Sequence, residues 1–372
     1  MYRRSYLFLI GTAALILSLA VFSSIKLDRR LLDPEGSFLG PSYIRFPLLL
    51  LGALLLDLLP LTVWLARGRP SRVIPIVKHR LRTHWTKERA TLVGVGVIAF
   101  YVTYVSYRNL KSFLPFVRSD PHAAPGEVKA LSYDRELHLL DKVIFFGHDP
   151  SDVLHGIFGK TLTAEVLSPV YLMFLPLVPL GLTAWLVWSR NLSFGYWFVT
   201  AQCIAWSLGT LSYYLLPTLG PGIAYPSEYY GSGGLAHTGT TDLMEGIVRS
   251  RGNLLYGGAT TSVNSIAGFA SLHCAITLLF ALMVQYTLTS KLLKRIFWTN
   301  FGLTMIATLY FGWHYVADDI AGIAIAVVAF YVGGLASGQK FDRHRSSPSP
   351  DSAADATSTE APSDGDSEVT TV

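Results

Sequence analysis

The chain has 372 residues, of which 51% are hydrophobic and 15% are charged, and its mean hydropathy is +0.40. Soluble globular proteins carry about 25% charged residues, so this composition is typical of a membrane protein and excludes an ordinary soluble domain. The formal charge of +5 does not indicate nucleic-acid binding, because the basic residues gather in a few short segments and not on an aromatic-studded face.

Apolar runs of about 20 residues, the length that crosses the hydrocarbon of a bilayer, recur along the chain. We predict about eight membrane helices, near 5–25, 45–66, 90–108, 168–188, 193–216, 271–290, 296–312 and 315–336. Arg3 and Arg4 resemble the start of a signal peptide, but no small-residue cleavage site follows. We therefore interpret the first run as a retained anchor helix.

The distribution of Lys and Arg predicts the orientation in the cell membrane. Segment 67–89 is rich in both, which favours the cytosol, and alternation of the helices then places the two termini there. The outer face receives 26–44, 109–167, 217–270 and the turn 311–315. We expect short surface helices in 109–167 and an irregular rim in 217–270.

The predicted organisation has three parts. Residues 1–89 hold two N-terminal transmembrane helices and the basic cytosolic loop, 90–336 form the membrane core, and 337–372 form a disordered cytosolic tail. Cys203 and Cys274 lie in apolar runs, so we expect no disulfide between them. His148 and His155 lie in an Asp-rich segment, but the chemistry developed below needs no metal, so we expect neither a metal nor a cofactor.

The stretch from Tyr310 to Gly322 places a histidine and two carboxylates at the mouth of an apolar helix. His314 and Asp318 are four residues apart, which on a helix lets the carboxylate accept a ring N–H. Such a contact fixes the imidazole tautomer and leaves the other ring nitrogen free to attack or to take a proton. We interpret the neighbouring Asp319 as a solvated or capping carboxylate.

A second cluster, Ser271-Leu272-His273, opens the run 271–290 on the same predicted face. Ser271 is a plausible N-cap, and the free N–H groups of a first helical turn form an anion cradle. Two histidines on one face, one of them paired with a carboxylate, suit phosphoryl transfer through a covalent intermediate.

These residues resemble a known family. Ser271 and His273, followed by His314 with Asp318, resemble the second and third motifs of the type-two phosphatidic acid phosphatase superfamily, over roughly residues 90–336. Segments 312–315, 146–151 and 217–221, with Asp141, resemble the branch that contains the inositolphosphotransferase domain of inositol phosphorylceramide synthases.

The resemblance implies an all-α membrane bundle with a phosphatase-type core of about six helices, to which the two N-terminal helices would be an addition. It also implies site roles. His314 would be the nucleophile and Asp318 its partner, His273 the general acid, and Ser271 a phosphate ligand.

The sequence departs from the family pattern where phosphate charge must be neutralised. Ala270 and Leu272 replace the usual Pro and Gly, and Thr308 stands where an arginine is common. The first motif, a Lys with an Arg-Pro seven residues later, is missing from 217–270. A cation is nevertheless required at the phosphate. The candidates are Lys111 and Arg118, which have the motif's spacing, and Arg249 and Arg251, which are closer in sequence to Ser271.

The sequence predicts an integral-membrane phosphotransferase or phosphatase that acts on a lipid phosphate ester through a phosphohistidine, with possible transfer of phosphoinositol to a lipid or glycan hydroxyl. Two alternatives stay open: a polyprenyl-phosphate or phosphatidate-type lipid phosphatase, and a non-catalytic lipid-binding scaffold or transporter. The expected partners are the membrane, a lipid phosphate or phospholipid and an alcohol acceptor, without nucleic acid. Geometry separates an enzyme from a scaffold, because an enzyme needs His273 and His314 to converge on a phosphate-sized space lined by a cation.

Overall fold

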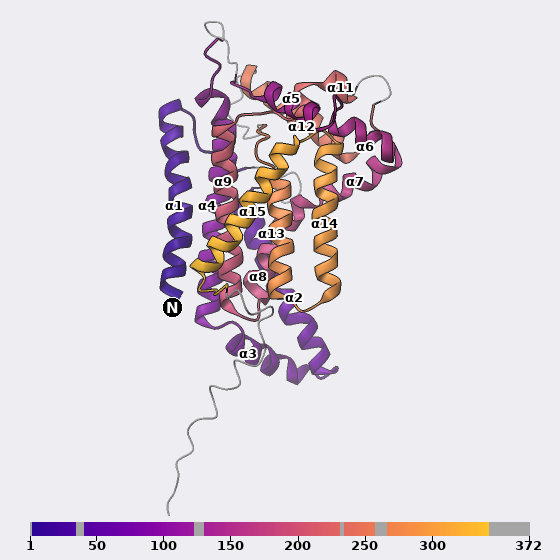
Figure 1. Ribbon diagram of the computed structural model, residues 1–372. Coiled ribbons are helices and arrows are strands. Elements are labelled where there is room, and N and C mark those ends of the chain that lie inside the picture. Colours follow the sequence, from indigo (N-terminus) through magenta and orange to yellow (C-terminus); the bar gives the residue numbers. More distant parts are fainter. Residues whose placement is uncertain (1, 35–40, 123–129, 231–233, 257–265, 342–372) are drawn as a thin grey trace, which may run out of the picture. The chain divides into compact units, whose positions relative to one another are not determined.

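The computed structural model describes residues 2–34, 41–122, 130–230, 234–256 and 266–341. These residues form helices and no strand, apart from one isolated bridge between Ser119 and Ala130. Residues Met1–Gln339 make one compact unit (Figure 1). The all-α prediction is therefore confirmed. The tail predicted to be disordered lies almost wholly outside the described residues.

Helices of two kinds make up this unit. Long ones run side by side, and shorter ones lie beyond their ends (Figure 1). In chain order they are α1 (Tyr2–Leu27), α2 (Ser42–Ala66), η1 (Pro70–Arg72), α3 (Val73–Thr83), α4 (Lys87–Val117), α5 (Asp134–Ile144), α6 (Pro150–Phe158), α7 (Leu162–Leu172), α8 (Phe174–Trp188), α9 (Leu192–Leu215), α10 (Pro221–Ala224), α11 (Pro226–Tyr230), α12 (Gly239–Tyr256), α13 (Leu272–Thr287), α14 (Lys291–Tyr310) and α15 (Val316–Ala336).

Five segments of the described residues are long and apolar enough to cross a membrane: Tyr6–Leu27, Tyr43–Ala66, Lys87–Val117, Leu162–Trp188 and Val316–Ala336. The other three predicted runs correspond to α9, α13 and α14. α13 is a shorter apolar helix of 16 residues, while α9 and α14 are long enough but do not reach the same apolarity. Those helices pack against their neighbours, so they need less apolar surface.

The bundle is built around α4, α9, α13 and α15. α15 packs on α9 and α13, α9 packs on α4, and α14 packs on α13, while α1 covers α4 from outside. Side-chain caps set four of the helix starts: Thr86 for α4, Asn191 for α9, Ser271 for α13 and Ser290 for α14 each accept a hydrogen bond from a first-turn N–H. The first residues of α13 and of α15 lie together, since the Ser271 N–H donates to the Asp318 carbonyl.

The segments predicted for the outer face lie together at one end of the bundle (Figure 1). Segment 109–167 contains α5, α6 and the start of α7, as expected. The prediction of an irregular rim for 217–270 is wrong in its middle, because α12 is a helix of 18 residues. The Gly and Pro residues that suggested a rim lie mostly before Gly239, and 257–265 fall outside the described residues.

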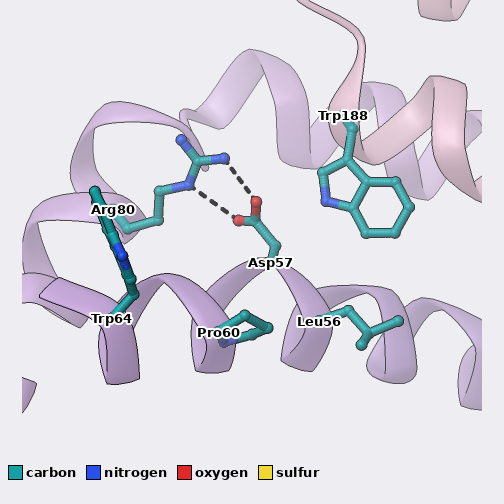
Figure 2. Close-up of a pocket in the computed structure, with 6 residues that line it drawn as sticks. All are labelled: Leu56, Asp57, Pro60, Trp64, Arg80 and Trp188. Atoms are coloured by element: carbon teal, nitrogen blue, oxygen red, sulfur yellow. Dashed lines mark hydrogen bonds and ion pairs between the residues drawn. The ribbon is translucent and has the colours of Figure 1, made fainter.

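Asp57 of α2 has a cationic partner on another helix, although α2 itself offers none. The Asp57 carboxylate accepts hydrogen bonds from Arg80 of α3, from Nη2 at 2.6 Å and from Nε at 3.1 Å (Figure 2). Trp85 Nε1 donates to the same carboxylate at 3.2 Å. The pair joins α2 to α3 at the end of the bundle opposite the predicted histidine site (Figure 1).

Candidate active site

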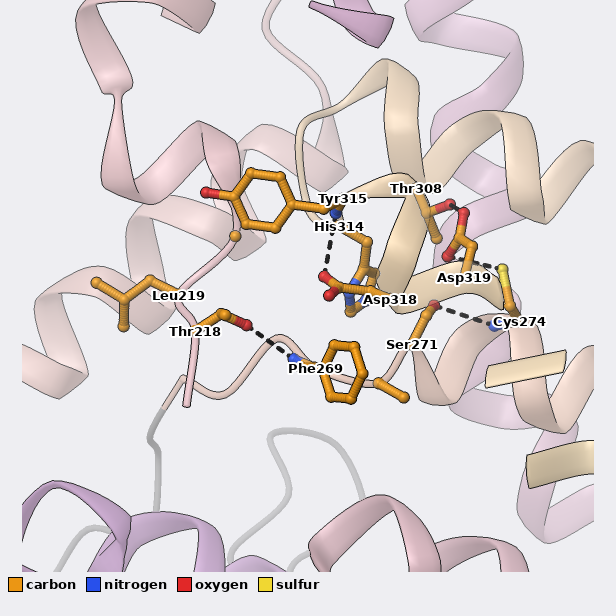
Figure 3. A network of polar contacts seen from close by, with 12 residues as sticks. Thr218, Leu219, Phe269, Ser271, Cys274, Thr308, His314, Tyr315, Asp318 and Asp319 are labelled. Atoms are coloured by element: carbon orange, nitrogen blue, oxygen red, sulfur yellow. Dashed lines mark hydrogen bonds and ion pairs between the residues drawn. The ribbon is translucent and has the colours of Figure 1, made fainter. Parts of the chain in front are cut away.

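His314 lies in the turn between α14 and α15, and its side chain is 7% exposed. Its Nδ1 lies 3.3 Å from Oδ2 of Asp318, a fully buried residue in the first turn of α15 (Figure 3). The same carboxylate oxygen accepts the backbone N–H of Tyr315 at 3.0 Å, which fixes its direction. The contact places the ring proton on Nδ1 and leaves the Nε2 lone pair available for attack on an electrophile.

The start of α13 is held directly against the start of α15. The Ser271 N–H donates to the Asp318 carbonyl at 2.9 Å, and the Ser271 hydroxyl accepts the Cys274 N–H at 3.3 Å. A Cβ built on Gly322 would lie 2.3 Å from the Ser271 carbonyl oxygen, so only glycine allows the two segments to approach this closely. This contact brings His273, the second residue of α13, to the same place as His314.

The two imidazole rings converge, since their centroids are 6.1 Å apart and their planes are inclined by 55°. His273 is held between Tyr171 and Phe174, at the junction of α7 and α8, with both centroids 4.2 Å from its own. Trp313 stacks on the far side of Tyr171 at 5.4 Å. These aromatic contacts restrict the motion of the His273 ring, whose centroid lies 6.1 Å from that of His314.

Of the four candidate cations, Lys111 of α4 is the one whose charge lies within electrostatic reach of the His273 imidazole. The Lys111 ammonium also lies 3.5 Å from the Tyr107 hydroxyl and 5.4 Å from the centre of the Tyr213 ring. The candidate cation is therefore held among tyrosine side chains of α4 and α9.

The three arginines occupy other environments. Arg249 is exposed on α12, and Arg118 ends α4, where its Nε is buried without a hydrogen-bond partner in the described part of the chain. Arg251 is half-buried on α12, where burial lowers the pKa of its guanidinium, and it lies within electrostatic reach of Asp134. None of the three has a recorded contact with His273 or His314 among the described residues.

The comparisons with known proteins agree with this geometry. Residues 135–332, more than half of the chain, match the family model of the PAP2 superfamily. The chain belongs to the PAP2 superfamily. No curated protein and no solved structure gives a match. PAP2 membership supports a membrane enzyme of the lipid phosphatase type, and the matched region contains both histidines. It begins after α4, so Lys111 lies outside it.

Asp319 is part of a buried network that sequence analysis missed. It is 3% exposed and not solvated, which corrects the prediction. Its Oδ1 accepts the Cys274 thiol at 3.0 Å and its Oδ2 accepts the Thr308 hydroxyl at 2.8 Å (Figure 3). Thr308 occupies the position where an arginine is common in the PAP2 superfamily. In this chain the position ties α14 to α15 and α13 through a carboxylate.

α5 supplies a second group of residues that sequence analysis did not assign. Asp134 is buried and accepts the backbone N–H groups of Leu219 and Gly220 and the Tyr315 hydroxyl, all at about 3.0 Å. Gly220 has a φ of 94°, and a Cβ on it would lie 2.3 Å from the Trp313 carbonyl oxygen. Asp134 thereby holds the 219–220 turn against the loop that carries His314.

Asp141, two turns further along α5, holds the other side of the same loop. Both of its carboxylate oxygens lie 3.3 Å from the Val316 N–H, the first residue of α15, and the residue is 2% exposed. The pKa of Asp141 is raised to about 7, chiefly by burial and also by the nearby Asp318 and Asp149 carboxylates, while the hydrogen bond from Val316 opposes this rise. The sequence hint was the spacing of seven residues, which puts Asp134 and Asp141 on one helical face.

Proposed function

We propose that the protein cleaves the phosphate ester of a membrane lipid through a phosphohistidine on His314. The observation that carries this proposal is the 6.1 Å separation of the two ring centroids, with the Lys111 charge within electrostatic reach of His273. Both rings can reach one phosphate that lies to the side of the line joining their centroids, with phosphorus about 3–3.5 Å from the attacking nitrogen and an ester oxygen about 2.7–3.2 Å from the other ring.

In the proposed reaction Nε2 of His314 attacks phosphorus, and the bond from phosphorus to the leaving oxygen breaks. His273 gives its proton to that oxygen, and the leaving alcohol departs neutral. Asp318 keeps the other proton on Nδ1 and stabilises the positive charge on His314. Lys111 and the N–H groups at the start of α13 stabilise the negative charge on the phosphate oxygens.

In the second half of the reaction His273 takes a proton from an incoming hydroxyl group, whose oxygen attacks the phosphohistidine and releases His314. Water as the attacking group gives hydrolysis, and an alcohol gives transfer of a phospho-alcohol head group. We favour transfer, with phosphoinositol as one candidate group. With Thr308 in place of an arginine, the site suits a singly charged phosphodiester better than a doubly charged monoester.

Product analysis tests the proposal. Purified full-length protein is given phosphatidylinositol labelled in phosphorus, or a labelled polyprenyl phosphate, with and without a lipid alcohol. A labelled diester that forms only with the alcohol would support transfer, whereas inorganic phosphate from the monoester would favour a hydrolytic lipid phosphatase. No product from either lipid would favour the non-catalytic scaffold.

A further inference from the structure

A second polar site lies at the end of the bundle opposite the two histidines, where α3 crosses the ends of α2 and α8 (Figure 1). It is a cavity of about 490 Å³. Its walls are Leu56, Asp57, Pro60 and Trp64 of α2, Arg80 of α3 and Trp188 at the end of α8 (Figure 2). The proposed reaction uses none of these residues.

The ion pair in its wall holds one guanidinium in a fixed position. The Asp57 side chain is 4% exposed and binds two of the three Arg80 nitrogens, Nη2 and Nε, while the Arg80 side chain is 30% exposed. The third nitrogen, Nη1, has no hydrogen-bond partner in the described parts of the chain. Arg80 therefore offers pre-oriented N–H donors at low entropic cost.

Charges around the cavity do not balance. Arg89 is 5% exposed, donates to the carbonyls of Leu186, Val187 and Ser189, and is close enough for its charge to interact with those of Arg80 and Asp57. His84 donates to the Val187 carbonyl, and burial lowers the pKa of its imidazole. Two guanidinium groups thus lie within electrostatic reach of one carboxylate, and a single negative charge would balance them.

The surroundings of the cavity are those of a bilayer boundary. It opens beside Trp188, the last residue of α8. Trp64 is 72% exposed and Trp188 is 41% exposed, and tryptophans with this exposure are typical of the head-group level of a membrane. α2 carries exposed leucines next to the cavity, and α3 is a basic helix. Lipid head groups and acyl chains both have matching surfaces here.

We propose that this cavity binds one anionic phospholipid of the surrounding bilayer, with its phosphate on Nη1 of Arg80 and its acyl chains along α2 beside Trp64 and Trp188. The phosphate supplies the missing negative charge through charge-assisted hydrogen bonds. The bound lipid fastens the α2 and α3 pair to the end of α8. This proposal is independent of the reaction at His314.

Lipid-dependent stabilisation of the full-length protein in detergent tests it. Phosphatidylglycerol is compared with phosphatidylcholine of the same chains and with inorganic phosphate, by thermal unfolding and by native mass spectrometry. We expect phosphatidylglycerol alone to raise Tm and to stay bound. Equal effects of the two lipids would overturn the charge argument. An equal effect of inorganic phosphate would show an anion site without lipid.

Two variants of α2 locate the effect. Leu56→Trp fills the cavity and should weaken the apparent affinity for phosphatidylglycerol at least tenfold. Leu59→Trp, on an exposed leucine of the same helix that does not line the cavity, should leave it unchanged. If Leu56→Trp fails to fold, Trp188→Ala removes a wall and serves instead. Equal losses in the wall variant and in Leu59→Trp, or no loss in the wall variant, would contradict the proposal.

Discussion

Lys111 is distant in sequence from both histidines, and it is our candidate for the cation at the site. The proposed reaction needs a cation at the phosphate, and Lys111 is the candidate whose charge reaches His273. Its partner in the motif spacing, Arg118, sits at the end of α4 and has no recorded contact with the histidines.

Replacing Lys111 with Met should lower kcat/KM on the lipid substrate by about 10²–10³, because removing one group that stabilises transition-state charge typically has this effect. Lys111→Arg should keep part of the activity. Arg249→Gln, which changes an exposed arginine of α12, is the matched control and should behave as wild type. Normal turnover by Lys111→Met would exclude Lys111 from the site.

Thr308 and Thr304 lie one turn apart on α14, and both are buried. Thr308 donates to Asp319, whereas the Thr304 hydroxyl has no hydrogen-bond partner in the described parts of the chain. Thr308→Val leaves a buried carboxylate oxygen with one donor fewer, and it should lower the free energy of unfolding by about 1–3 kcal/mol.

Thr304→Val is the matched control for that change. This change removes a buried hydroxyl that has no hydrogen-bond partner among the described residues. The Tm of this variant should therefore equal or exceed that of wild type. Thermal unfolding of the three proteins in one detergent makes the comparison. Equal losses in both variants would mean that the Asp319 network does not stabilise the packing of α13, α14 and α15.

Contacts between residues close in sequence could be predicted, whereas contacts that depend on helix packing could not. The contact between His314 and Asp318 and the cap by Ser271 each involve residues three or four apart, and helical geometry dictates such contacts. Whether Lys111 lies within electrostatic reach of His273 depends on which helices pack together. Helix packing could not be predicted from this one sequence. Asp319 was misjudged for the same reason, because its donors come from two other helices.

At the scale of elements, α5 works as a clamp. Its two buried carboxylates hold the 219–220 turn, Tyr315 and the start of α15, on both sides of the loop that carries His314. The sequence predicted a short surface helix here. It did not predict that Asp134 and Asp141 bind the 219–220 turn, Tyr315 and Val316, because these partners are distant in sequence. α12 was not predicted, because the Gly and Pro residues before it dominate the composition of segment 217–270.

Asp141 should make stability depend on pH. Its pKa in the folded protein, about 7, lies above its ordinary value of 3.8, so the folded state binds this proton more tightly than the unfolded state does. Its contribution to the free energy of unfolding is therefore greatest below about pH 4 and declines as pH rises to about 7, by at most about 1.4 kcal/mol per pH unit.

Tm measured between pH 5 and pH 8 tests this dependence. Asp141→Asn should fall less steeply with pH than wild type, because it has no proton to lose. Asp152→Asn, at an exposed position of the neighbouring α6, should keep the wild-type slope. Parallel curves for Asp141→Asn and wild type would show that the Asp141 carboxyl is not the titrating group.

At the scale of the whole molecule, the basic residues near α3 and the histidine site lie at opposite ends of the bundle (Figure 1). If the basic end is cytosolic, the site opens at the outer face. His148→Cys and Ser71→Cys, both at exposed positions, place one thiol at each end, while the free Cys203 and Cys274 are buried.

A membrane-impermeant maleimide should label His148→Cys in intact cells and Ser71→Cys only after permeabilisation. Wild type serves as the control for reaction at the two buried native thiols. The reverse labelling pattern would indicate the opposite orientation in the membrane, with the histidines at the cytosolic face.

Trapping the phosphohistidine is the most direct test of the proposal that His314 is the nucleophile. Full-length protein is mixed with lipid labelled in phosphorus, quenched in alkali to preserve phosphohistidine, digested and analysed by mass spectrometry, with His314→Ala as the control. We expect label on the peptide that contains His314, and we expect neither label nor turnover in His314→Ala. Label on another residue, or undiminished turnover by His314→Ala, would contradict it.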